Sequence, residues 1–214
     1  MSRTLYSLML NEDLVREVDR LAHRMGTNRS NMVNSILAEY LHFTTPEQRI
    51  NEILSGVERL LLPANEFVPF LAPGAMSLSL KSSLEYKYRP TVKYEVQLFR
   101  GGGGTLGELH VIFRTQSAGL LSEMAAFFRL WKAVEEPLLS AAGVQPDYAL
   151  YDGKFTRSIA VPRNEPDTET LADAISGYIR TFDRCMKRCL SGEYDVSDVR
   201  REYASYLEKT GLYI

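Results

Sequence analysis

The stretch that decides the fold is RTLYSLMLNEDLVREVDRLAHRMGTNRSNMVNSILAEYL, which occupies residues 3–41. It begins with alternating side chains from Thr4 to Leu10, a pattern that indicates a β-strand. Two segments with helical periodicity follow, separated by a turn. A lone strand cannot satisfy its own backbone hydrogen bonds, and two helices cannot each bury an apolar stripe without a further surface. We therefore expect residues 1–43 to fold as a homodimer.

Both helical segments have sequence signals at their ends. Asn11 can cap the first helix, and two carboxylates follow it at the positive end of the helix dipole. Gly26 ends this helix, because glycine readily adopts the left-handed conformation that a helix stop often needs. Either Asn28 or Ser30 can cap the second helix. The two apolar stripes consist of Leu14, Val18, Leu21, Ala22 and Met25, and of Met32, Val33, Ile36, Leu37, Tyr40 and Leu41.

This arrangement resembles the ribbon-helix-helix family of the Arc and CopG type. The matching pieces are the strand ending in Leu10, the opening Asn11-Glu12-Asp13-Leu14, the stop Met25-Gly26, and Asn28-Arg29-Ser30 before the second helix. The resemblance covers about residues 3–42, a fifth of the chain. It implies that two strands pair antiparallel across a two-fold axis, and that the resulting ribbon enters the major groove of DNA.

The resemblance also implies which residues contact DNA. The ribbon positions that face the bases map onto Leu5, Ser7 and Met9. The positions that bind phosphate map onto Arg3, Asn28, Arg29 and Ser30. Ribbons of this family usually present polar side chains to the bases, whereas Leu5 and Met9 can make only apolar contacts, such as with a thymine methyl group.

The charge of residues 1–43 leaves two functions open. This segment contains five arginines, no lysine and five acidic residues, so its net charge is near zero, whereas DNA-binding surfaces are usually basic. The first function is a homodimeric, bacterial-type transcriptional regulator or repressor that binds DNA and has a C-terminal sensing or assembly domain. The alternative is a protein-binding accessory factor of a nucleic-acid machine, which uses the N-terminal module for dimerisation only.

The composition is typical of a soluble globular protein. The chain has 214 residues, of which 45% are hydrophobic and 24% charged, and its formal net charge is −2. This charge argues against coating nucleic acid or a membrane by bulk electrostatics. We find neither a signal peptide nor an apolar run long enough to span a membrane. We therefore expect a cytoplasmic protein without a membrane partner.

The predicted fold class is α+β, with the N-terminal module followed by an antiparallel-sheet domain packed with helices and by a helical C-terminus. The predicted parts are a module at 1–43, a connector helix at 44–65, the sheet domain at 66–161 and C-terminal helices at 162–214. Thr45 is placed to cap the connector helix. Its apolar face can pack on the sheet domain or on the two-fold mate, and the C-terminal domain can also bind a protein partner.

Periodicity predicts the remaining elements. Three strands of an antiparallel meander are predicted at 78–88, 92–98 and 106–115. A hairpin around Asp152-Gly153 can extend this meander to five strands. Helices are predicted at 46–62, 117–142, 168–190 and 196–210, and an irregular segment at 63–75. Trp131 lies on the most apolar helix, where core packing is the default and an interface is the alternative.

The sequence contains no pattern that indicates catalysis or a cofactor. The four glycines at 101–104 separate two strands and lack the lysine that follows a phosphate-binding loop, so they predict a hairpin loop. Cys185 and Cys189 are too few ligands for zinc, and we expect buried, reduced thiols. The basic side chains Arg180, Arg184, Lys187 and Arg188 predict a solvated helix face near acidic neighbours. We therefore predict no enzyme activity, metal or cofactor.

Overall fold

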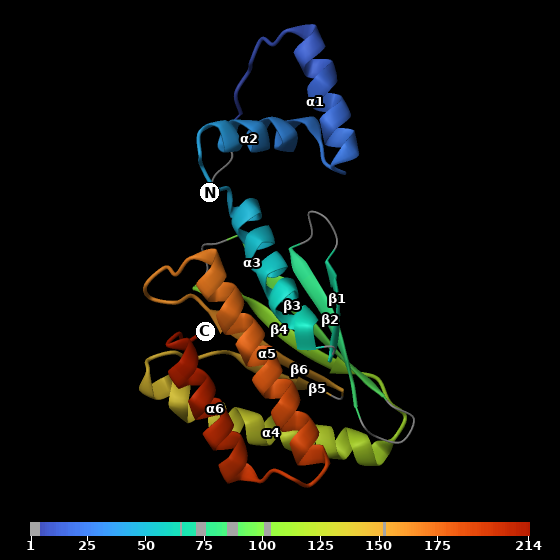
Figure 1. Cartoon of the computed structure of the whole chain (residues 1–214), viewed down its shortest axis with the longest axis vertical. Helices are drawn as coiled ribbons and strands as arrows, with labels where there is room; N and C mark the ends of the chain where they lie inside the picture. Colours follow the sequence, from blue (N-terminus) through green and yellow to red (C-terminus); the bar gives the residue numbers. More distant parts are fainter. Residues whose placement is uncertain (1–4, 65, 72–75, 85–89, 101–103, 152) are drawn as a thin grey trace.

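The structure is a computed structural model of the chain, and its fold is mixed α/β, as predicted. It describes residues 5–64, 66–71, 76–84, 90–100, 104–151 and 153–214. Within these residues, six α-helices accompany one antiparallel sheet of six strands. Figure 1 shows two parts: the helices α1 (Glu12–Arg24) and α2 (Arg29–Tyr40) stand at one end, and the sheet forms a larger body with the other four helices.

The sheet has the strand order β1-β2-β3-β4-β6-β5, and all neighbouring strands are antiparallel. The strands are β1 (Phe67–Leu71), β2 (Ser77–Ser83), β3 (Thr91–Leu98), β4 (Thr105–Phe113), β5 (Tyr148–Tyr151) and β6 (Lys154–Ala160). The predicted meander is confirmed in β2, β3 and β4, and the predicted hairpin in β5 and β6. Gly153 has φ 71° in the hairpin turn, a value that favours glycine. Residues 85–89 and Asp152 of these predictions lie outside the described residues.

The prediction of an irregular segment at 63–75 is wrong in part, because residues 67–71 form strand β1 at the edge of the sheet. A one-turn 3-10 helix, η1 (Leu62–Ala64), precedes the strand. Pro69 pairs with Leu80 of β2, although proline has no backbone N–H to donate. An edge strand tolerates proline because one of its sides has no neighbour. Pro69 therefore lies in an edge strand, and residues 65 and 72–75 of this prediction lie outside the described residues.

The other four helices occur where the sequence predicts them. They are α3 (Pro46–Leu61), α4 (Ala118–Ala141), α5 (Thr168–Leu190) and α6 (Val196–Thr210). Aromatic contacts place α4 and α5 on the same face of the sheet: Phe128 of α4 lies 5.3 Å from Phe155 of β6, and Phe182 of α5 lies 5.6 Å from the same ring. Trp131 is only 1% exposed, so it belongs to the core and not to an interface.

Helix α3 connects the two parts of the molecule, and it is capped at its N-terminus and packed closely along its length. Thr45 and Gln48 form a capping box, in which each side chain accepts a hydrogen bond from the backbone N–H of the other. The helix packs on α5 at close range, because a Cβ added at Gly56 would lie 2.7 Å from the Ala172 Cβ. Residues 41–45 alone separate α2 from α3. Helix α3 therefore packs as part of the body, and it connects the body to the helix pair.

A buried ion pair connects the sheet with the helices. Arg157 of β6 and Glu135 of α4 are 1% and 0% exposed, and Arg157 Nε lies 2.9 Å from Glu135 Oε1. Three further donors bind the carboxylate of Glu135: Trp131 Nε1, the Tyr178 hydroxyl and the Tyr203 hydroxyl. Burial opposes the charge of Arg157, but the Glu135 carboxylate outweighs it and raises the pKa of the guanidinium above its usual value.

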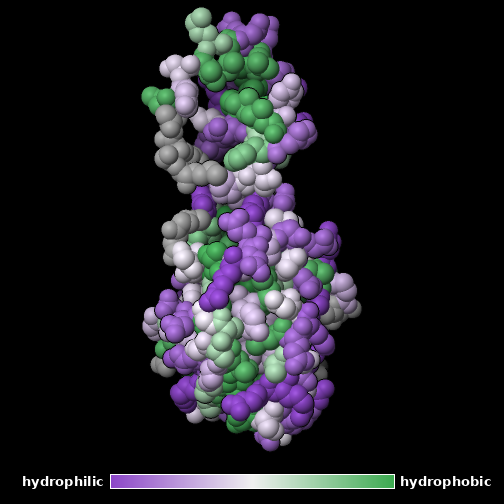
Figure 2. Space-filling view, turned by 90° about the vertical axis from the view of Figure 1, so that its left-hand side faces the viewer, coloured by the Kyte–Doolittle hydropathy of each residue, from purple (hydrophilic) through white to green (hydrophobic). Residues whose placement is uncertain are grey.

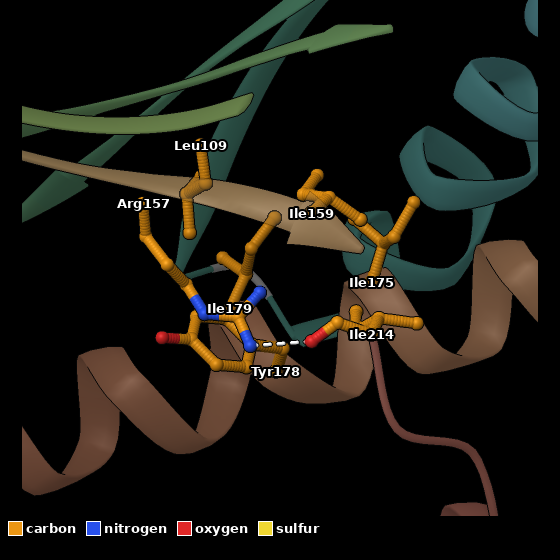
Figure 3. A pocket seen from close by; sticks show the side chains of 7 residues that line it. All are labelled: Leu109, Arg157, Ile159, Ile175, Tyr178, Ile179 and Ile214. Carbon is orange, nitrogen blue, oxygen red and sulfur yellow. Dashed lines mark hydrogen bonds between the residues drawn. The ribbon is translucent and has the colours of Figure 1, made fainter. Parts of the chain in front are cut away.

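The same guanidinium binds the end of the described chain. Arg157 Nη2 donates a hydrogen bond to the carbonyl oxygen of Ile214, as Figure 3 shows. Ile214 is 3% exposed, and it lines a small pocket together with Arg157, Tyr178 and four aliphatic side chains. The ion pair therefore holds α4, β6, α5, α6 and the segment after α6 together.

We expect Arg157→Met to lower the free energy of unfolding by about 3–5 kcal/mol, because it leaves the Glu135 carboxylate buried without its cation. Urea unfolding at neutral pH measures this loss. Arg201→Met serves as the matched control, because Arg201 forms an exposed ion pair with Asp198 and its loss costs no more than about 1 kcal/mol. Equal unfolding midpoints for the two variants would contradict the structural role of the buried pair.

Candidate functional site

The N-terminal helix pair has the local structure that its sequence predicts. The Asn11 side chain accepts a hydrogen bond from the Asp13 N–H at 2.8 Å and so caps α1. The Asn28 side chain caps α2 by accepting from the Asn31 N–H at 2.9 Å, which decides between the two candidate caps. Gly26 has φ 62° in the turn between the helices. Local sequence therefore determines both helices.

The helix pair buries little of its apolar surface. Among residues 5–43, the buried side chains are those of Val18, Ala22 and Ala38. Twelve of the twenty large hydrophobic side chains exposed in the described residues lie here, in a fifth of the chain. They are Leu5, Tyr6, Leu8, Met9, Leu10, Leu14, Met25, Ile36, Leu37, Tyr40, Leu41 and Phe43. Figure 2 shows hydrophobic residues gathered on one face of the N-terminal part. An apolar surface of this extent marks an interaction site.

The strand predicted from Thr4 to Leu10 is not present in the single chain. Thr4 lies outside the described residues, and residues 5–10 have no regular secondary structure. The physical reason is that a strand requires hydrogen bonds to a neighbouring strand. No described strand of the same chain pairs with this segment. The structure therefore shows two helices in this segment and does not confirm the predicted ribbon-helix-helix module.

Within residues 5–10, the predicted base-facing positions differ in exposure from the alternate positions on the opposite face of the predicted strand. Leu5 and Met9 are 96% and 102% exposed, and Ser7 between them is also exposed. On the alternate positions, Leu8 and Leu10 are 64% and 44% exposed. On these alternate positions Leu10 is the least exposed, whereas Tyr6 is 80% exposed. The three predicted base-facing positions project into solvent.

The predicted phosphate-binding residues meet at the start of α2, except for Arg3, which lies outside the described residues. Asn28 uses its side-chain oxygen as the helix cap, and Ser30 is exposed. Arg29 forms a two-bond contact with Asp19 of α1, with Nε–Oδ1 2.6 Å and Nη2–Oδ2 2.5 Å. This hydrogen bonding and the charge of Arg29 hold the pKa of Asp19 below its usual value. Within the described residues, Arg29 Nη1 makes no hydrogen bond.

Two of the three arginines of α1 are also paired with carboxylates, whereas Arg24 forms no ion pair within the described residues. Arg16 binds Asp13, and Arg20 binds Glu17 at 2.6 Å, each three residues apart on the helix. These pairs are exposed, so each contributes little to stability. They nevertheless offset the positive charge of the helix surface locally. The helix pair therefore has no strong basic area of its own.

The basic surface predicted on α5 has acidic neighbours, as expected. Arg184 lies 2.5 Å from Glu202, Lys187 lies 2.6 Å from the buried Asp183, and Arg188 binds Glu193. The fourth cation, Arg180, forms no ion pair within the described residues, and its Nε is buried without a hydrogen-bond partner there. Because the other three cations are already paired, this helix face is a poor site for nucleic acid.

The two cysteines are free thiols, and Cys185 is buried as predicted, whereas Cys189 is only partly buried. Burial raises the pKa of Cys185 to about 12 and that of Cys189 to about 11, so neither is a reactive thiolate at neutral pH. No three His, Cys, Asp or Glu residues are grouped to hold a metal ion in the described part of the chain. Of the glycine run, Gly104 is described and has φ 76° before β4, whereas residues 101–103 lie outside the described residues.

The buried polar residues were missed from the sequence. Arg157 lies two residues from both Phe155 and Ile159, so strand alternation alone places it on the buried face. Glu135 had no comparable signal, because it belongs to a helix that is apolar on more than one side. Asp183 is likewise buried, where it accepts a hydrogen bond from the Tyr94 hydroxyl at 2.8 Å.

Comparisons of this chain with known protein families, with curated proteins and with solved structures find no match. No helix in the described ranges is both long and apolar enough to cross a membrane. The functional argument therefore depends on the geometry of the chain itself.

We expect Arg29→Gln to raise the pKa of Asp19 toward the ordinary value for aspartate, because the substitution removes the charged guanidinium whose two hydrogen bonds and charge lower it. An NMR pH titration of the carboxyl carbons measures this change. Asp167 serves as the control, since the backbone and side chain of Thr170 lower its pKa. Unchanged titration of Asp19 would show that Arg29 is not engaged with it in solution.

Proposed function

We propose that the chain is a homodimeric DNA-binding regulator of the ribbon-helix-helix type. The single observation that carries this proposal is the twelve exposed apolar side chains on residues 5–43. Residues 5–43 expose both strand-forming side chains and the apolar stripes of two helices. These features require an apolar surface to pack against and a strand to pair with. A second copy of the segment supplies that surface, because it offers both a partner strand and two further helix stripes.

In the proposed dimer, residues 5–10 of two copies pair antiparallel. Leu8 and Leu10 then pack against the helices, in agreement with their lower exposure, and Leu5, Ser7 and Met9 face outward. Pairing satisfies the backbone groups that the single chain leaves open. The outward side chains enter the major groove, where Leu5 and Met9 contact thymine methyl groups and Ser7 donates or accepts a hydrogen bond.

Arg29 is the proposed phosphate contact next to the ribbon. Its Nη1 group remains available while Nε and Nη2 bind Asp19, so Asp19 holds the guanidinium in position at the start of α2. The N-terminus of a helix favours an anion through its free N–H groups and its dipole. The body then serves for sensing, assembly or contact with a protein partner, and the proposed role is regulatory and not catalytic.

We expect Leu8→Asp to convert the dimer into a monomer, because it places a carboxylate inside the proposed ribbon–helix core. Sedimentation equilibrium of the full chain measures the molar mass. Val196→Asp is the matched control, since Val196 is a 54% exposed apolar residue at the start of α6 and lies in the body. A monomeric wild type, or a Leu8→Asp variant that remains dimeric, would contradict the proposal.

We expect Arg29→Ala to weaken binding to all duplex sequences alike and to lower the salt dependence, d log K/d log[salt], by about 1, because one phosphate contact is lost. Fluorescence anisotropy with a mixed-sequence duplex at several salt concentrations measures both effects. Arg201→Ala on α6 removes the same charge from another exposed ion pair and controls for net charge. Identical salt slopes for the two variants would refute the role of Arg29.

A second function is supported by a specific observation. Arg16, Arg20 and Arg29 are each paired with a carboxylate, so the helix pair presents little free positive charge. This favours a protein-binding accessory factor of a nucleic-acid machine that uses the N-terminal segment for dimerisation only. A wild-type dimer that binds neither duplex nor single strands at low salt would decide for this alternative.

A further inference from the structure

One face of the sheet is not covered by any helix of the described residues. Strand residues alternate between buried positions under the helices and partly exposed positions on the opposite face. Both α4 and α5 contact aromatic rings of the buried positions, and Figure 1 shows the helices in front of the sheet. The opposite face, which we call the open face, carries the side chains of the alternate positions.

Strand register places three lysines in one row across the open face. Lys81 of β2 is opposite Lys93 of β3, Lys93 is opposite Ile112 of β4, and Ile112 is opposite Lys154 of β6. The row, which we call the lysine row, continues at its two ends in Val68 of β1 and Tyr151 of β5. Both end residues are exposed, at 69% and 65%.

The charges of the lysine row are poorly compensated. Lys81 and Lys93 are directly opposed, and like charges at opposed positions destabilise a sheet. Lys93 has a carboxylate partner, with Nζ 2.8 Å from Glu95 Oε2. Within the described residues, neither Lys81 nor Lys154 forms an ion pair. The sequence therefore keeps two free ammonium groups and one paired group in a single line, at a cost in stability.

The rest of the open face does not cancel this charge. Glu95 and Glu108 lie on the same side of the lysine row, in the next two rows of the face. His110 between them bonds with Thr156, at 3.1 Å between Nδ1 and Oγ1. Burial and the neighbouring Lys154 hold the pKa of His110 below its usual value, so this ring is neutral at physiological pH. The open face is consequently basic along one row and acidic beside it.

We propose that the lysine row binds the phosphate backbone of the DNA duplex that the N-terminal ribbon contacts, an inference that rests on the proposed function. The N-terminal helix pair is close to neutral, so the electrostatic part of DNA affinity needs another surface. Lys93 and Lys154 lie two strands apart, a distance of about 10 Å. Their flexible stems allow ammonium groups at this spacing to reach separate phosphates. Ile112 between them contacts the sugars.

The full chain with Lys81→Gln and Lys154→Gln together tests this inference. Both side chains are at the surface and lack ion pairs in the described structure, so the double variant keeps the fold, which circular dichroism verifies. Arg129→Gln with Lys209→Gln is the matched control, since it removes two exposed charges from α4 and α6. Binding of a mixed-sequence duplex is measured by fluorescence anisotropy over a series of salt concentrations.

We expect the lysine variant to reduce the salt slope by about 2, because two phosphate contacts are lost, and the control pair to leave it unchanged. Equal slopes for both pairs would overturn the lysine row as a contact and leave the proposed function standing if Arg29→Ala still weakens binding. If the lysine variant binds the duplex more weakly while Arg29→Ala and Leu8→Asp have no effect, the lysine row is supported and the N-terminal site is overturned. If the wild-type chain does not bind the duplex, both the lysine row and the proposed DNA-binding function are overturned.

Discussion

Residues 5–43 form two well-capped helices, yet they bury three side chains and leave twelve large hydrophobic ones in solvent. Burial of apolar surface is the dominant favourable contribution to folding, at roughly 25 cal/mol per Å². A single copy of residues 5–43 cannot gain this stabilisation from burial of its apolar surface. Residues 5–10 likewise have no strand to pair with, and the proposed second copy supplies both a partner strand and a core surface. The proposed function follows from this constraint.

The body has the opposite character, because it completes its own core. Helices α4 and α5 cover one face of the sheet through stacked aromatic rings, and the Glu135–Arg157 pair connects the elements on both sides of this core. A buried charge is tolerated only with partners, and Glu135 has four. The body is thus self-sufficient, which leaves its open face and its edge strands for other molecules.

Periodicity and capping residues predicted every helix and five of the six strands, because these signals are local. Strand β1 was missed, since Pro69 is compatible with an edge position that only the finished sheet defines. The sequence named the candidate residues of the helix pair, but the Asp19–Arg29 contact joins residues ten positions apart on two helices and needed coordinates. The lysine row was equally invisible, because cross-strand register is a tertiary property.

Helix α3 has a mechanical consequence for a dimer of this kind. Its sixteen residues span about 24 Å, and its inner face is locked into the body while its first turn begins five residues after α2. Each copy of α3 then acts as a stiff lever arm between the shared N-terminal base and one body. Because α3 is rigid, a displacement of the two bodies relative to each other also displaces the N-terminal base.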